Sequence, residues 1–309
     1  MKERNSMAHI RRRQVSAMGI HYLYYPLEYM LDAQAAAGFQ TIELVGMAPH
    51  FLIDHTGYQD PAPVRRMAEE RGLTIGCFTP ECAIYQYLMC APDPGSHQRS
   101  MEYFKRGLEA ASEFGAKLLL TNCIGGTRDE EYGRIYERAV RSLSELAPVA
   151  ADCGVTIAVE TVRPEESSCI ITLPELKKLL ADVDHPHVKA GLDTIAMGVA
   201  GETPEQWFAE RGGDIVHTHF VDGRPYGHLV WGDGLYPLER YLDVLNRHGY
   251  EGYLSQEITD PRYFEDPAAA DKRAFEAFLP FMEDAPLHFT RCGEEAVTDV
   301  KGIKEPAHV

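Results

Sequence analysis

The sequence predicts a single (β/α)8 barrel, because one short unit recurs along most of its 309 residues. In each unit an amphipathic helix ends at a glycine, and a short, nearly continuous apolar strand follows at once. Glycine suits the left-handed position that ends many helices. Strands that are apolar throughout are typical of a parallel sheet covered by helices. Eight such strands in about 270 residues fit a closed barrel.

The elements can be placed in order along the chain. The glycines that end helices are Gly38, Gly72, Gly115, Gly154, Gly213 and Gly249. The predicted strands are 14–20, 41–45, 73–78, 117–121, 155–160, 188–193, 215–219 and 253–257. Between them, apolar residues recur at the helical period. Thr172 with Glu175 predicts a capping box at a helix start, and Pro148 predicts a kink or an early end to its helix.

A doubly wound open sheet is the alternative architecture, but no Gly-rich phosphate loop follows the first strand. The chain is predicted to comprise an N-terminal arm at 1–14, the barrel at 15–284 and a C-terminal tail at 285–309. Both ends lack the periodicity of a packed element. The arm, with three consecutive arginines at 11–13, is predicted to be solvated.

The composition restricts the class of protein. Hydrophobic residues make up 45% and charged residues 25%, which is typical of a globular domain. The net charge of −17 argues against a nucleic-acid partner, which needs a basic surface. No apolar run approaches the roughly 20 residues of a membrane span, and no signal peptide is evident. Seven scattered cysteines indicate a reducing compartment, so we expect a cytoplasmic protein.

Four consecutive predicted strands end on a side chain that can bind a metal ion: Glu160, Asp193, His219 and Glu257. The C-terminal strand ends of a barrel converge on one place, where active sites lie. Three carboxylates crowded there would repel one another and be costly to desolvate. One divalent cation would relieve this. A set of three carboxylates and one imidazole suits Mn²⁺ best, with Mg²⁺, Co²⁺ or Zn²⁺ as alternatives.

The same arrangement suggests a reaction. His217 and His219 lie on one strand face, and His219 is nearer the mouth, so His217 is predicted to pack below it or to orient it. An ion that holds two vicinal sugar oxygens can polarise a carbonyl and stabilise an enediolate. Glu160 and Glu257 would flank the reacting carbon and are the candidate acid/base pair.

Several stretches resemble the sugar isomerase/epimerase superfamily of xylose-isomerase-like barrels, and within it the fructoselysine 3-epimerase-like branch. The stretches that carry the resemblance are Thr41–His50, Thr79–Cys82, Val159–Ser167, His217–Asp222, Gly232–Gly234 and Gly249–Tyr253. The resemblance implies a metal-dependent epimerase or isomerase of a sugar or sugar derivative, with Glu160, Asp193, His219 and Glu257 as ligands. It also implies a small-molecule substrate and a homo-oligomer.

The resemblance also implies a further set of residues that contact the substrate. One acid follows strand five, two residues lie towards the end of strand two, and three lie in the loop after strand seven. The aromatic ring among them is suited to stacking on a sugar face, and packing within the loop or an oligomer contact is the alternative. These residues are Glu43, His50, Glu166, Arg224, His228 and Trp231.

Three other functions fit parts of the pattern. A lyase similar to inosose dehydratases, or to the large subunit of C-glycoside deglycosidases that act on 3-oxo-glycosides, would begin with the same proton abstraction and then expel a leaving group. Ala196 and Pro225 stand where tagatose-type epimerases carry His and Arg, which keeps this alternative open, and a small partner subunit would accompany it. An apurinic endonuclease needs more histidines and a basic surface. A non-catalytic binding protein would not need all four ligand positions filled.

Overall fold

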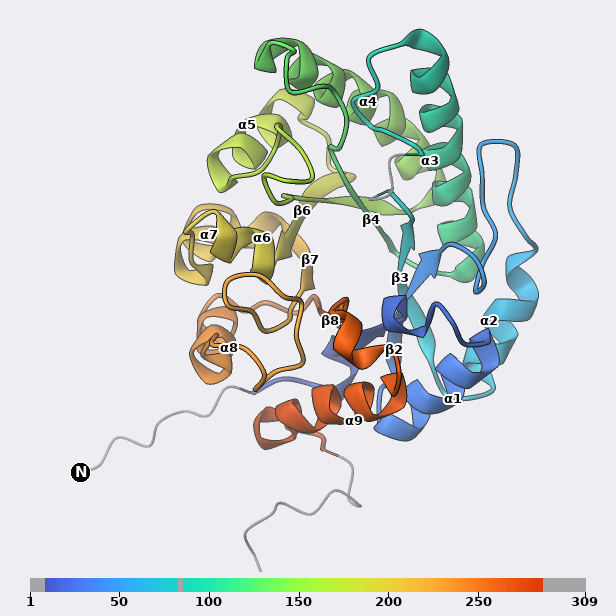
Figure 1. The fold of residues 1–309 in the computed structure, drawn as a ribbon, viewed down its shortest axis with the longest axis vertical. Coiled ribbons are helices and arrows are strands. Elements are labelled where there is room, and N and C mark those ends of the chain that lie inside the picture. The colour runs from blue at the N-terminus through green and yellow to red at the C-terminus, as the bar shows by residue number, and fades with distance from the viewer. Residues whose placement is uncertain (1–8, 83–85, 286–309) are drawn as a thin grey trace, which may run out of the picture.

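A computed structural model describes residues 9–82 and 86–285 and shows a closed barrel of eight parallel strands (Figure 1). The strands are β1 Val15–Met18, β2 Thr41–Gly46, β3 Thr74–Pro80, β4 Leu118–Asn122, β5 Thr156–Glu160, β6 Val188–Asp193, β7 Ile215–His219 and β8 Tyr253–Gln256. Each strand pairs with the next, and β8 pairs with β1, where Val15 lies opposite Leu254. The predicted barrel is confirmed, and the doubly wound sheet is wrong because the ring has no edge strand.

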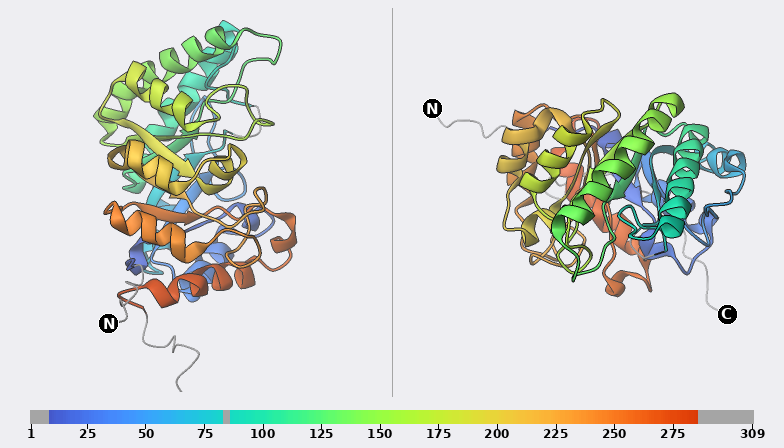
Figure 2. Two further views of the ribbon diagram at one scale, coloured as in Figure 1. Left: turned by 90° about the vertical axis from the view of Figure 1, so that its left-hand side faces the viewer. Right: turned by 90° about the horizontal axis from the view of Figure 1, so that it is seen from above.

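Helices surround the barrel, and the loops that follow the strands lie at one end of it (Figure 2). The helices are α1 Leu27–Ala37, α2 Pro61–Glu69, α3 Pro94–Phe114, α4 Tyr132–Cys153, α5 Leu173–Val183, α6 Thr194–Val199, α7 Pro204–Arg211, α8 Leu238–Arg247 and α9 Pro267–Phe278. The last helix, α9, lies beside α1, so the outer layer closes as the sheet does (Figure 1). Among the described helices, none has the length and apolar character to cross a membrane.

Local signals set many of the helix ends. Gly38 and Gly154 are left-handed at the ends of α1 and α4, with φ angles of 113° and 64°. The predicted capping box of Thr172 and Glu175 starts α5. Gly213 differs from the other glycines, because it lies in the one-turn 3-10 helix Gly212–Asp214. The recurring unit of a helix, a glycine and a strand is therefore present at most, but not all, of the predicted places.

Two predictions about local structure are only partly right. The helix α4 continues through Pro148, so the predicted early end is wrong, whereas the alternative, a kink, stays a prediction. Apolar residues on both sides of this proline are buried, and their packing outweighs the hydrogen bond that proline cannot donate. The end of the predicted arm is solvated only in part. Arg11 and Arg13 are exposed, but Ile10 is buried and bridges to Met282, and Arg12 Nε donates to the carbonyl of Gly38 at 2.6 Å. Residues 1–8 and 286–309 lie outside the described residues.

Candidate metal centre and active site

The strand register brings the four predicted ligands to the mouth of the barrel. Asp193 at the end of β6 pairs with His219 at the end of β7, and His219 pairs with Ser255 on β8. Glu257 comes directly after β8, and Glu160 ends β5. Because neighbouring parallel strands end side by side, these four side chains share one small region.

Within this region, close contacts connect five side chains in a row. His219 Nδ1 lies 3.1 Å from Glu160 Oε2 and 3.0 Å from Glu257 Oε2. His228, from the loop after β7, places Nε2 at 3.0 Å from the same Glu257 oxygen and 3.3 Å from Asp193 Oδ2. Three carboxylates and two imidazoles therefore converge in a mostly buried cluster.

This donor set fits a divalent cation. His219 Nε2 faces Glu43 Oε1 at 3.1 Å, so its N–H is assigned there. The other nitrogen, Nδ1, is buried and has no hydrogen-bond partner. It faces the carboxylates of Glu160 and Glu257, so this point of the site requires positive charge. Ligand atoms around an octahedral ion at about 2.1 Å lie about 3 Å from one another, which matches the separations of these three side chains.

The pKa of His219 shows the same requirement for positive charge. Burial acts to lower the pKa of His219, yet the charges of Glu257, Glu43 and Glu160 raise it well above its ordinary value. Either a proton or a metal ion can satisfy the carboxylates at Nδ1, and a metal ligand must give up its proton.

Glu43 supports the site from below. Its Oε2 accepts a hydrogen bond from His217 Nε2 at 2.8 Å, and its Oε1 accepts from His219 and, at 2.5 Å, from Thr79 Oγ1. Burial opposes ionisation, but the two imidazoles lower the pKa of Glu43 well below its ordinary value. Glu43, His217 and His219 offer ligand atoms within 4.8 Å of one another, but their mutual hydrogen bonds already use these atoms. Glu43 therefore orients the two rings, as carboxylates commonly do behind metal-binding histidines.

The position of Glu43 corrects the prediction that it contacts the substrate. It is 1% exposed, and its side chain is enclosed by the barrel beneath His219. The sequence held a signal for this role, since Glu43 is a carboxylate inside the apolar strand 41–45. A buried charge in such a strand needs a partner.

The remaining charged groups of the cluster have shifted pKa values. Burial raises the pKa of Glu160 to about 7, with His219 opposing the shift and Glu257 and Asp193 adding to it. Burial would also raise the pKa of Glu257, but His219 and His228 lower it below its ordinary range. Burial lowers the pKa of His228, but Glu257 and Asp193 outweigh this and raise it to about 10. The electrostatics of the cluster are thus strongly coupled.

The loop after β7 holds His228 in place. His228 has a φ angle of 43°, which is uncommon for a residue other than glycine. Asp222, 1% exposed, organises this loop by accepting hydrogen bonds from four backbone N–H groups. The donors are Gly223, Gly232, Gly234 and Tyr236, at 2.8–2.9 Å. The strained backbone of His228 is therefore stabilised by its surroundings.

A cavity of about 240 Å³ lies over the cluster. Its wall includes Glu160, Asp193, Glu257, His228 and the predicted substrate contact Glu166. Apolar side chains from the loops after β1 and β2 complete one side; they are Ile20, Leu23 and Met47. The cavity thus joins an ionic floor to an apolar side, as in many small-molecule sites.

Two polar residues are among those of this cavity that the sequence does not assign to the site. Asn122 is the last residue of β4, and Arg163 lies in the loop after β5. Asn122 obeys the same strand-end rule as the ligands, but it is neutral and was not considered. Arg163 donates to Glu166 through its backbone N–H at 2.8 Å and through Nε at 3.0 Å, so it fixes the orientation of that acid.

Besides Glu43, three of the predicted substrate contacts do not line this cavity. His50 is buried, and its Nε2 contacts the carbonyl of Tyr25 at 3.1 Å beside a separate surface groove. Arg224 is exposed and donates to the carbonyl of Asp233. Trp231 is 5% exposed, with its Nε1 donating to Phe220 O at 2.9 Å, and it packs in the aromatic core near α8 and α9.

The fold and this site define a (β/α)8 protein whose charged side chains gather at the C-terminal mouth of the barrel. The chain belongs to the family described as Xylose isomerase-like TIM barrel, whose profile matches residues 31–279.

Named relatives lie in the sugar epimerase branch. The chain is 27% identical over 262 residues to fructoselysine 3-epimerase of Escherichia coli O157:H7, covering 84% of this chain and 94% of that protein. It is 25% identical to D-psicose 3-epimerase of Enterocloster bolteae, covering 78% of this chain and 82% of that protein. Among solved structures, 3-keto-D-glucoside 4-epimerase from E. coli superposes with a TM-score of 0.73 at 19% identity, over 87% of this chain and 99% of that one.

Proposed function

We propose that this protein is a divalent-metal-dependent epimerase or isomerase of a sugar or sugar derivative. The observation that carries the proposal is the pair of carboxylates, buried Glu160 and half-buried Glu257, on either side of His219 at the floor of a cavity. The relatives named as sugar epimerases support the same reaction class.

Glu160, Asp193, His219 and Glu257 would hold the ion, and their oxygen-rich set favours Mn²⁺. When bound, the ion supplies positive charge that polarises the substrate carbonyl. Asp193 is held in place because Oδ1 accepts from the backbone N–H of Ile195 at 2.8 Å.

The two glutamates would move the proton. Glu257 Oε2 removes the hydrogen of the carbon next to the carbonyl, and the C–H electron pair moves into the new C=C bond of an enediolate while the carbonyl oxygen takes the negative charge. A protonated Glu160 then donates its proton to the opposite face of the same carbon, and the carbonyl forms again. One proton is taken and one is returned, so the configuration is inverted without any other reactant.

Solvent deuterium tests this function. We expect the Mn²⁺-loaded protein to place deuterium at the epimerised carbon of a keto-sugar in D₂O, detected by NMR together with the epimer. Glu160→Gln and Glu257→Gln should each lower this exchange by about 10³-fold, within the usual range for acid/base groups. The exposed Glu239 on α8 offers a matched control, since Glu239→Gln should leave the exchange unchanged.

Two outcomes would contradict the proposal. Undiminished exchange in both glutamine variants, with manganese still bound, would remove the acid/base pair. An eliminated product in place of the epimer would indicate the lyase instead.

A further inference from the structure

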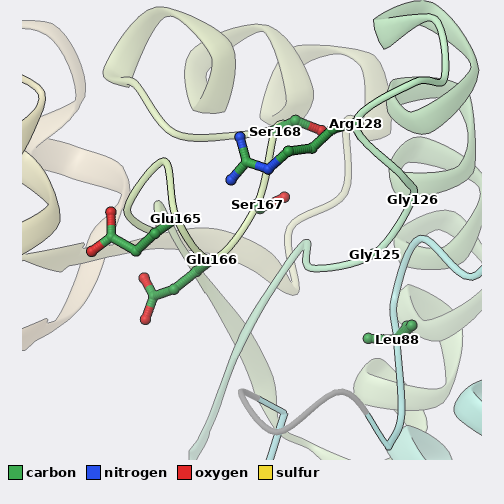
Figure 3. Close-up of a pocket in the computed structure, with 8 residues that line it drawn as sticks. All are labelled: Leu88, Gly125, Gly126, Arg128, Glu165, Glu166, Ser167 and Ser168. Carbon is green, nitrogen blue, oxygen red and sulfur yellow. The ribbon is translucent and has the colours of Figure 1, made fainter.

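A second cavity lies beside the first, between the loops that follow β3, β4 and β5 (Figure 3). Its volume is about 160 Å³. The side chains that line it include Leu88, Arg128, Glu165 and Ser168. Glu166 lines both cavities, so the two share one wall. The two cavities therefore adjoin at Glu166.

The outer cavity has fixed walls on the side of β4. Gly125 is left-handed with a φ angle of 134°, and a Cβ atom there would lie 2.8 Å from the carbonyl carbon of Cys90. Arg138 on α4 binds the carboxylate of Glu130 at 2.9 and 2.6 Å and donates to the carbonyl of Cys90 at 2.9 Å. The loops after β3 and β4 are thus joined without a ligand, which lowers the cost of ordering them on binding.

The shared wall is also fixed. Arg163 holds Glu166 through its backbone N–H and its guanidinium. Ser167, the next residue, accepts the N–H of Cys169 at 3.1 Å through its hydroxyl. Figure 3 shows Arg128 reaching from the loop after β4 towards the loop that carries Glu165 and Ser168. Its guanidinium donates to the carbonyl of Pro164, which places it across the entrance between the two loops.

The lining indicates what kind of group binds there. Arg128 has five N–H donors, and it forms no ion pair within the described part of the chain. Ser168 adds a hydroxyl, and among the described residues that line this cavity Leu88 has the one apolar side chain. Sugar hydroxyls donate and accept hydrogen bonds, so such a mixed lining suits them. A cavity of about 150 Å³ holds benzene, so this cavity of about 160 Å³ has room for the ring atoms of a sugar.

We propose that the outer cavity is a subsite for a second, hydroxylated ring, so that the substrate is a keto-sugar carrying a glycosyl unit. This inference rests on the proposed function, because the keto-sugar part is held at the metal cluster. Arg128 is its main specificity-determining residue, and it lies outside the cavity in which the reaction takes place.

Turnover of matched sugars tests the subsite. Fructose would be compared with trehalulose and isomaltulose, which carry a glucosyl unit on O1 and on O6, using deuterium exchange by the Mn²⁺-loaded protein. We expect kcat/KM to be at least about tenfold higher for one of the disaccharides than for fructose. Arg128→Ala should lower kcat/KM for that disaccharide about tenfold, which is the usual loss for a hydrogen bond from a charged group, and leave fructose unchanged. Arg134→Ala, an exposed arginine on α4, is the matched control.

Calorimetric binding of the same disaccharides separates the two proposals. Binding that Arg128→Ala weakens, without exchange on any sugar, would support the subsite and contradict the proposed function. Exchange with equal kcat/KM for fructose and both disaccharides would overturn the subsite alone. An equal loss for fructose and the disaccharide in Arg128→Ala would also overturn it.

Discussion

The two halves of the barrel mouth differ sharply in charge, although the strands that form them are alike. The strands β5, β6 and β7 end on Glu160, Asp193 and His219, and Glu257 directly follows β8. The strands β1 to β4 end on uncharged residues; they are Met18, Gly46, Pro80 and Asn122.

The difference follows from the order of the strands. Because β5 to β8 are consecutive in the ring, Glu160 and Glu257 both lie close to His219, at 3.1 and 3.0 Å. The other half contributes two carboxylates: Glu43 on β2 reaches His219 from below at 3.1 Å, and Glu81, directly after β3, lines the cavity. We therefore expect the half formed by β5 to β8 to bind the ion, and the other half to orient the ligands and shape the cavity.

The strongest test of this division is removal of the ion. Chelation should lower turnover by at least about 10³-fold, because the charged half would lose the cation that polarises the carbonyl. Mn²⁺ should restore it and, at about 100 times its Kd, should raise the free energy of unfolding by about 2.7 kcal/mol. Measurements of turnover check the first expectation, and measurements of thermal unfolding check the second. Full turnover in metal-free protein would remove the distinction between the two halves.

The next test concerns the support from the other half. Glu43→Gln keeps the size of the side chain but loses the charge that orients His217 and His219. We expect Mn²⁺ affinity to fall about 10–100-fold, as for other carboxylates behind metal ligands. Glu28→Gln, at an exposed position of α1, is the control. Unchanged affinity in Glu43→Gln would show that the ring of His219 is held without it.

A third test uses the pH dependence of metal binding. Before the ion binds, burial raises the pKa of Glu160 to about 7. Below that pH the carboxyl group is protonated and the ion must displace this proton, whereas above it the carboxylate is free. Mn²⁺ affinity should therefore fall by an additional factor of about ten per pH unit below pH 7. Titration calorimetry at several pH values measures this slope, and Glu160→Gln should abolish the break.

The smallest effect is expected at Trp231, which sequence reasoning assigned to the substrate. Trp231→Phe loses the hydrogen bond to Phe220 O, but Gln256 Nε2 also donates to that oxygen at 2.9 Å, so it keeps a partner. We expect a loss of about 1 kcal/mol in unfolding free energy. KM should change less than about twofold, since the ring lies in the core. A tenfold rise in KM with unchanged stability would restore the predicted contact.

The sequence predicts the strand ends well and the loops poorly, for a physical reason. All strands of a parallel barrel run in the same direction, so an ionisable residue at the C-terminal end of any strand lies at the same mouth of the barrel. This is why Glu160, Asp193 and His219 could be placed at the mouth of the barrel without a structure. A loop residue such as Arg224 or Trp231 is placed by distant contacts, here with Asp233 and Phe220.

The same reasoning explains the error at Pro148. Its local effect is to end a helix, but burial of the residues on both sides of it depends on the whole barrel. Gly213 shows the converse, because a glycine at the expected spacing lies in a 3-10 turn when the preceding helix α7 ends sooner, at Arg211. The spacing of glycines along the chain does not distinguish a left-handed glycine that ends a helix from a glycine in a 3-10 turn.

The pairing of β8 with β1 also has a consequence for synthesis of the chain. While the ribosome is still making the last segment, β1 and β7 both have one unpaired edge, and such edges are prone to join other chains. Glu257 is the last of the four acidic or imidazole ligands to be made, directly after β8. Closure of the ring and completion of the proposed ion-binding set therefore occur at nearly the same stage of translation.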